Sequence, residues 1–140
     1  MVLPLLLALL FGLIEMSWAF AQVNDIRYGA REGARTYAVE IDDVGTIGAA
    51  VCDRMDIVSP SQNVSVVLTP DVSYAEGSVG ALATITVTAD LQTITGFYDF
   101  LLAGKTISST VEFRIEQPSS GTESAWWTEA ASGSGTHDCS

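Results

Sequence analysis

Apolar residues dominate the first 23 positions of the chain and do not alternate with polar ones. Residues 2–14 carry no charge, Glu15 interrupts the run, and the apolar stretch then continues to Val23. Wound as an α-helix, a stretch of this length can cross a hydrocarbon core of about 30 Å. The pattern therefore predicts a transmembrane anchor over residues 1–23, followed by a domain outside the cytoplasm.

A cleaved signal peptide is the alternative interpretation of this segment. Ala19, Phe20 and Ala21 resemble a signal-peptidase site before Gln22. However, no Lys or Arg precedes the apolar run, and Glu15 is unusual so close to such a site. We expect an uncut anchor, and both interpretations place the rest of the chain outside the cytoplasm.

Glu15 is a candidate site residue because it is an intramembrane charge. A carboxylate within an apolar helix is costly, so it usually has a partner or faces a pore. The alternative is that Glu15 lies near enough to the membrane interface to reach water. The sequence leaves both interpretations open.

The helical pattern continues beyond the anchor as far as residue 39. Residues 16–39 contain no proline, and Arg27, Arg31 and Arg35 recur at a spacing that places them on one stripe. Gly29 and Gly33 form a GxxxG pattern, which lets two helices approach closely. The alternative is that these glycines only loosen the helix. We expect helix packing at Gly29 and Gly33.

A second helix is predicted after residue 43, with Asp42 or Asp43 as its N-cap. Its apolar residues fall at helical spacing on one face, and Ser59-Pro60 would end it. These residues are Val44, Ile47, Val51, Met55 and Val58.

Three strands are predicted next, over residues 63–69, 81–90 and 106–116, because apolar and polar residues alternate there. Residues 91–105 are too long for a hairpin turn, so their apolar cluster either covers the sheet as a short helix or forms an exposed contact patch. Residues 118–140 are rich in Ser, Gly and Thr, which indicates a flexible tail, although Trp126 and Trp127 within it are candidates for docking on the domain.

These elements predict an α+β fold: a long N-terminal transmembrane helix, a second helix packed on a three-stranded antiparallel sheet, and a flexible C-terminal tail. The expected organisation is an anchor over residues 1–23, an extracytoplasmic domain over residues 24–117 and the tail over residues 118–140.

Charge is concentrated outside the anchor. The formal net charge is −11, and residues 1–39 sum to zero, so residues 40–140 carry all of it. Such a surface repels phosphate and argues against nucleic acid as a partner.

The chain has two cysteines, Cys52 and Cys139, which lack the spacing of a zinc site. Outside the cytoplasm they could form one disulfide that ties the tail to the domain. The alternative is one buried thiol and one free thiol.

Candidate chemistry is sparse. His137 is the only histidine, and no nucleophile elbow, phosphate-binding loop or HExxH motif occurs. Asp42 and Asp43 are better explained as a helix cap than as paired catalytic carboxylates. We therefore predict no catalytic residue, no metal site and no cofactor.

Several N-terminal motifs resemble the TadE-like family of the tight-adherence (type IVc) pilus system. That family has a leucine-rich run after Leu-Pro, then Phe-Gly and Ile-Glu, then a motif ending in Ala-Arg-Glu-Gly-Ala-Arg. The matching positions here are Leu3-Pro4, Phe11-Gly12, Ile14-Glu15 and the stretch from Ala30 to Arg35, which includes the helix-face residues Arg31, Glu32 and Arg35. The ITVTA segment and the strand ISSTVEFRIEQP extend a weaker resemblance to about residue 117.

The resemblance implies a non-catalytic component of pilus assembly, a minor pilin or pseudopilin. Its implied location is the bacterial cytoplasmic membrane or the pilus, and its implied partners are other pilins, assembly-platform proteins and membrane lipid. The family usually has a basic leader and a glycine at a prepilin-peptidase site upstream of the Leu-Pro run. Because this chain begins at Met1-Val2, we expect either a start codon further upstream or no such processing.

Overall fold

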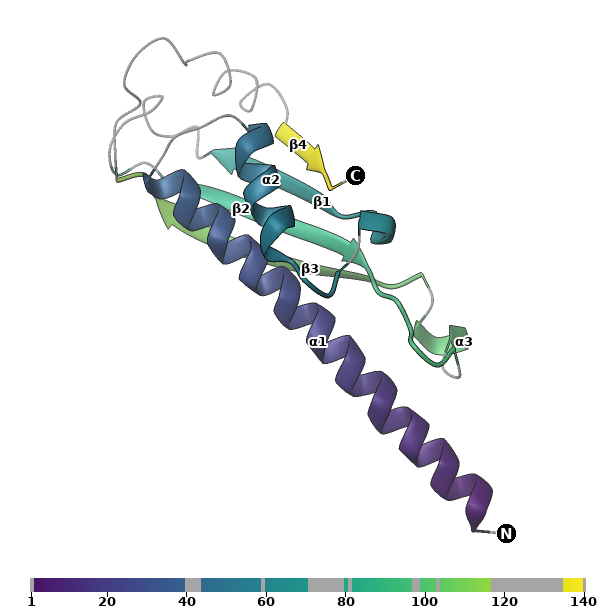
Figure 1. Cartoon of the computed structure of the whole chain (residues 1–140). Coiled ribbons are helices and arrows are strands. Elements are labelled where there is room, and N and C mark those ends of the chain that lie inside the picture. Colours follow the sequence, from purple (N-terminus) through teal and green to yellow (C-terminus); the bar gives the residue numbers. More distant parts are fainter. Residues whose placement is uncertain are drawn as a thin grey trace.

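A computed structural model describes residues 2–39, 44–58, 60–70, 80, 82–96, 99–102, 104–116 and 135–139. One long helix, α1 (Leu3–Val39), runs through the whole molecule (Figure 1). It is uninterrupted because its only proline, Pro4, lies in the first turn, where a missing backbone N–H costs nothing. The shorter α2 (Val44–Arg54) follows it, and then the 3-10 turn η1 (Pro60–Gln62).

The sheet has four antiparallel strands in the order β3-β2-β1-β4. They are β1 (Ser65–Pro70), β2 (Leu82–Asp90), β3 (Thr106–Arg114) and β4 (Gly135–Asp138). In β2 every second residue is buried, as the alternation of apolar and threonine residues predicts. Ile85 stands between Leu68 of β1 and Val111 of β3 in the register, at the centre of the sheet.

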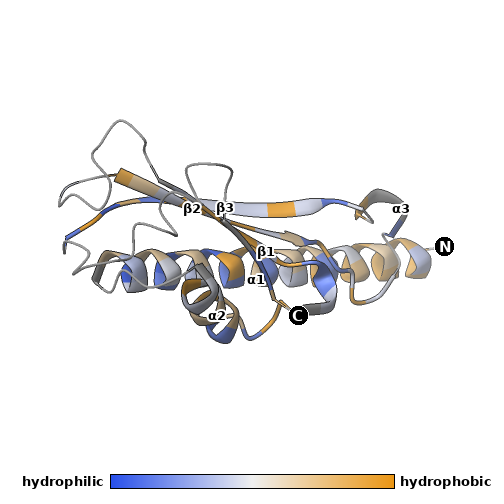
Figure 2. Ribbon diagram, turned by 90° about the horizontal axis from the view of Figure 1, so that it is seen from above, coloured by the Kyte–Doolittle hydropathy of each residue, from blue (hydrophilic) through white to orange (hydrophobic). Residues whose placement is uncertain are grey.

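The two helices form one layer and the sheet forms the other (Figure 2). The core lies between them and combines Ile26, Ala30 and Tyr37 of α1 with Val51 of α2 and Ile85 of the sheet. Tyr37 also packs edge-on against Phe113 of β3, with ring centroids 5.3 Å apart. The core is therefore built on the C-terminal part of α1, and the N-terminal part extends beyond it.

The predicted α+β class is confirmed, with the long helix, the second helix and the three main strands all present. Two details differ. The prediction of a flexible tail is wrong for residues 135–138, which form β4 against β1. The second helix ends at Arg54, earlier than Ser59-Pro60, for a reason given below.

Some predicted features lie outside the described residues: the capping role of Asp42 and Asp43, the docking of Trp126 and Trp127, and most of the tail. The connector between β2 and β3 contains one helical turn, α3 (Asp99–Leu102). The side chains of its cluster from Phe97 to Leu101 lie outside the description as well, so the choice between sheet cover and contact patch stays a prediction.

Candidate functional site

The N-terminal part of α1 exposes a continuous apolar surface. The exposed side chains are Val2, Leu3, Leu5, Leu6, Leu7, Leu9, Leu10, Leu13, Ile14, Met16 and Phe20. Within the described residues, α1 is the one helix long and apolar enough to cross a membrane, and only 6% of its most apolar window is buried. A soluble core helix would bury this surface, so its exposure favours the membrane interpretation.

Glu15 lies within the exposed apolar stretch of α1, but its own side chain is buried. Its Oε2 atom accepts two hydrogen bonds from Thr95, one from the backbone N–H at 3.2 Å and one from the hydroxyl at 2.8 Å. Its Oε1 atom is buried without a hydrogen-bond partner in the described part of the chain. Of the two interpretations of this charge, the geometry agrees with the one in which it has a partner.

Gln22 forms a second polar junction two turns further along α1. Its Oε1 atom accepts from the Gln92 backbone N–H at 3.0 Å and from Gln62 Nε2 at 2.7 Å, and its Nε2 atom donates to the Gln92 carbonyl at 2.8 Å. The side chain is fully buried, as a polar group can be when it is hydrogen-bonded. The junction fixes the start of the loop after β2 to the helix.

Asp25 forms a third junction and explains where α2 ends. Its two carboxylate oxygens accept the backbone N–H groups of Asp56, Ile57 and Val58, at 3.2, 2.8 and 2.8 Å. Those N–H groups would otherwise bond to carbonyls of α2, so the carboxylate replaces the next helical turn. Val58 is nevertheless buried, as predicted from its place on the apolar face.

Sequence reasoning missed Gln22 and Asp25 as site residues. The available signal was their position: Glu15, Gln22 and the buried Ile26 lie on one face of α1, and Asp25 lies beside that face. Polar residues along a face that is otherwise buried indicate long-range hydrogen bonds. What the spacing could not supply was the identity of the partners.

Gly29 and Gly33 lie where α1 meets α2. A Cβ atom on Gly33 would stand 2.5 Å from Val51 Cγ2 and 2.6 Å from Ile85 Cδ1, and one on Gly29 would stand 2.9 Å from Met55 Cγ. Both distances from Gly33 are shorter than atoms in contact allow. In this structure the close approach is therefore made within the chain, to α2 and β2.

The helix-face motif has a mixed environment. Arg31 and Arg35 are exposed, as is Arg27 on the same stripe, and Glu32 is half-buried. On the neighbouring surface, the Arg54 guanidinium lies 5.8 Å from the ring centroid of Tyr28. The arginine stripe thus remains available at the surface of the body.

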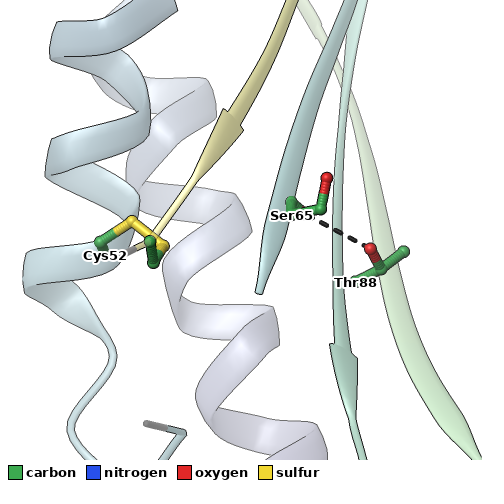
Figure 3. The surroundings of a disulfide bond; sticks show 4 residues. Cys52, Ser65 and Thr88 are labelled. Atoms are coloured by element: carbon green, nitrogen blue, oxygen red, sulfur yellow. Dashed lines mark hydrogen bonds between the residues drawn. A yellow bond between two sulfur atoms is a disulfide. The ribbon is translucent and has the colours of Figure 1, made fainter. Parts of the chain in front are cut away.

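Cys52 of α2 and Cys139, which follows β4, form a disulfide with Cα atoms 5.7 Å apart (Figure 3). The Cys139 N–H also donates to the Val64 carbonyl at 3.2 Å. His137 lies in β4 opposite Val66, and its ring lies against Gly48 of α2. The disulfide and the strand together hold residues 135–139 against the body.

No group of three or more His, Cys, Asp or Glu side chains with the arrangement of a metal site occurs in the part of the chain that the structure describes. The buried carboxylates Glu15 and Asp25 are engaged instead by Thr95 and by backbone N–H groups. The buried polar side chains of α1, namely Glu15, Gln22 and Asp25, therefore act as attachment points between segments.

Residues 1–35 match the model of the TadE-like protein family. Over this segment, a quarter of the chain, the protein is similar to that family. The match covers the exposed apolar part of α1, the α1 residue of each polar junction (Glu15, Gln22 and Asp25) and both packing glycines, and it ends at Arg35. The weaker resemblance of residues 36–117 rests on the strand motifs alone. Searches of curated proteins and of solved structures gave no significant match.

The likeness over residues 1–35 is to a pilus-associated family that is generally non-catalytic. The exposed apolar helix at the N-terminus is long and apolar enough to span a membrane, as a membrane-anchored pilus component would require.

Proposed function

We propose that this chain is a non-catalytic, membrane-anchored component of tight-adherence pilus assembly, acting as a minor pilin or pseudopilin. The observation that carries the proposal is the division of α1. One unbroken helix exposes apolar side chains from Leu3 to Phe20 and enters the core of the body from Gln22 onward. The TadE-like match covers this same helix.

This division suits a subunit that moves between a membrane and a filament. An apolar helix satisfies its own backbone hydrogen bonds, so it is stable in lipid. The same surface can later pack against neighbouring helices in a bundle, which needs shape complementarity and no catalytic group. The helix is continuous with the core, so a force on the anchor is transmitted to the body.

The proposed partners follow from the two surfaces of the molecule. The apolar surface of α1 suits membrane lipid, the helices of other pilins and the assembly-platform proteins. Residues 40–140, which make up most of the body, carry the net charge of −11. This charge suits an extracytoplasmic location and disfavours nucleic acid as a partner. In this proposal the body is displayed outside the cytoplasmic membrane, or on the pilus.

The alternative, a secreted acidic binding or adhesin domain released after Ala21, receives no support from the geometry. Cleavage there would cut α1 in mid-helix, immediately before the fully buried Gln22. It would also remove Glu15 and its bonds to Thr95. Determining the mature N-terminus by mass spectrometry tests this point, because a terminus at Gln22 would overturn the anchor.

The function is tested in the natural host by deleting the gene and counting pili by electron microscopy. We expect loss of pili and recovery with the wild-type gene. Leu9→Arg should fail to restore them, because an arginine in mid-membrane costs about 2.5–3.5 kcal/mol on insertion scales. Ser108→Arg, on the exposed side of β3, is the matched control and should restore them. Normal piliation of the deletion strain would refute the proposal.

A further inference from the structure

The loop over residues 91–96, between β2 and α3, is attached to α1 unusually far towards the N-terminus. Gln92 is bonded to Gln22 through its backbone, and Thr95 is bonded to Glu15. Figures 1 and 2 both show this end of the body, marked by α3, beside the N-terminal half of α1. The loop therefore reaches a level of α1 that the strands of the sheet do not reach.

That level lies within the apolar surface of α1. Phe20 is 62% exposed, whereas the first exposed polar side chains beyond it are Asn24 and, one turn on, the charged Arg27. Glu15 precedes Asn24 by nine residues, which is about 14 Å along a helix. The apolar surface thus extends well past the point where the loop is attached, and an anchor inserted as far as Phe20 brings the loop to the membrane.

At this level the Ser17 hydroxyl and the Oε2 atom of Glu15 are hydrogen-bonded within the protein, whereas Glu15 Oε1 is buried without a partner in the described residues. Ser17 is exposed, but its hydroxyl donates to the Leu13 carbonyl at 2.8 Å, a local bond that suits an apolar environment. Thr95 covers the Glu15 carboxylate, which is buried beneath the loop. The loop therefore screens the one charge within residues 2–24 from whatever surrounds the helix.

An apolar groove opens between the loop and α1. It has a volume of about 390 Å3 and is lined by Leu13, Ile14, Ser17, Trp18 and Ile94. Ile94 is 57% exposed and Ile14 is 42% exposed, so the groove continues directly into the apolar surface of the helix. Exposed isoleucine at the tip of a loop is unfavourable in water and favourable in contact with lipid.

We propose that the 91–96 loop is a second membrane contact, with Ile94 in the interfacial layer and a lipid acyl chain in the groove beside Trp18. The inference rests on the proposed membrane anchor. Lipid is the occupant because the groove is continuous with the surface that the anchor presents to lipid. A second copy is disfavoured, since its body would bring another large negative charge alongside this one.

The consequence is that the body does not swing freely on its anchor. Two contacts with the bilayer, the helix and the loop on one side of it, fix how the body is tilted and rotated over the membrane. Trp18 lies in the groove, and tryptophan favours the membrane interface.

The test uses the full chain in phosphatidylcholine vesicles, with an environment-sensitive fluorophore on one introduced cysteine. Both native cysteines are paired with each other, so labelling without a reductant is specific. The probe position is Ile94→Cys. Leu9→Cys reports the anchor, and Ser108→Cys on β3 reports the solvent-facing body. Quenching by phosphatidylcholine with a doxyl group on the acyl chain measures contact with lipid, and circular dichroism checks each fold.

We expect blue-shifted emission and quenching by the doxyl lipid at positions 9 and 94, but not at position 108. This result should hold at all protein-to-lipid ratios. If the label at position 9 is quenched but the label at position 94 is as unquenched as the one at position 108, the loop contact is overturned and the anchor is retained. No quenching at 9 overturns both. A blue shift at 94 that needs high protein density and shows no lipid quenching assigns the groove to a second copy and overturns the proposal.

If Ile94→Cys fails to fold, Gln92→Cys replaces it, because the Gln92 side chain is exposed and its bonds to Gln22 use only the backbone. A label there should be quenched more by a doxyl group near the headgroup than by one deep in the acyl chain. If neither doxyl lipid quenches the label at position 92, the proposal is overturned.

Discussion

Thr95 donates two hydrogen bonds to a single carboxylate oxygen of Glu15, although the two residues lie 80 positions apart in the chain. The bonds join the loop after β2 to the helix two turns before α1 enters the core at Gln22. A buried carboxylate is stable there only because these donors replace the water that it loses. The contact makes Glu15 part of the body's structure as well as part of the apolar segment.

Removing the Glu15 side chain should therefore destabilise the attachment of the loop. Glu15→Ala leaves the Thr95 N–H without its acceptor, and we expect a loss of about 1–3 kcal/mol in the free energy of unfolding. Glu15→Gln keeps one acceptor oxygen and should lose less. The measurement is chemical denaturation in detergent micelles, followed by circular dichroism. Glu32→Ala, a charge-matched change on the same helix, is the control, and an equal loss there would show that the Thr95 bonds contribute nothing specific.

Asp25 should contribute more than Glu15, because it accepts three backbone N–H groups. Hydrogen bonds to charged groups contribute about 1.5–3 kcal/mol each, although not additively, so we expect Asp25→Ala to lower the stability by about 2–4 kcal/mol. Asp25→Asn places an amide NH2 opposite at least one of the backbone N–H donors, where it cannot accept a hydrogen bond. This variant should therefore also lower the free energy of unfolding.

The same denaturation experiment measures both Asp25 variants, with the neighbouring exposed Asn24→Ala as control. Hydrogen exchange adds a local readout, since the amides of residues 56–58 should lose protection selectively. Unchanged protection of these amides in Asp25→Ala would contradict the role given to the carboxylate.

The regular elements were predictable because each follows from a local pattern. The unbroken helix follows from the absence of proline between residues 5 and 39. The strands follow from alternation such as that of Ile85 and Val87 with threonines. The end of α2 was not predictable in this way. Val58 has the helical spacing of the apolar face, but the helix stops at Arg54 because a carboxylate 31 residues before Asp56 captures the next N–H groups.

The same limit applies to the site and to β4. The sequence identified Glu15 as a charge that either has a partner or lies near the membrane interface, and nothing local marks Thr95 as its hydrogen-bond partner. Residues 135–138 were predicted to belong to a flexible tail because Gly, Ser and Thr dominate the sequence around them. Their strand depends on pairing with β1 and on the bond between Cys52 and Cys139, and both are contacts of long sequence separation.

Gly33→Ala should destabilise the protein even though alanine favours helices over glycine by about 1 kcal/mol. The new methyl group would collide with Val51 and Ile85, which are both buried, and overpacking of this kind costs about 1–3 kcal/mol. Gly29→Ala meets chiefly the flexible Met55 side chain, with Val51 Cγ1 further away at 3.3 Å, and should cost less. Thermal unfolding in detergent compares the two. A higher Tm for Gly33→Ala than for wild type would show that the glycine is not needed for close packing.

Loss of the disulfide should lower the stability of the whole body and release β4 first. Cys52 and Cys139 close a loop with a sequence separation of 87, for which the chain-entropy model gives about 4–5 kcal/mol. We therefore expect Cys52→Ser/Cys139→Ser to unfold at a clearly lower denaturant concentration, and wild-type protein treated with a reductant to match it. The reductant should leave the stability of the double variant unchanged, which controls for effects of the reductant that do not act through the disulfide.

Without the disulfide, hydrogen exchange should rise at residues 136–139 well before it rises in β2. The reason is that β4 pairs with only four residues of β1 and no longer has the covalent bond. Equal stability of the oxidised and reduced wild type, with β4 protected in both, would show that strand pairing and the packing of His137 hold the C-terminus without the bond.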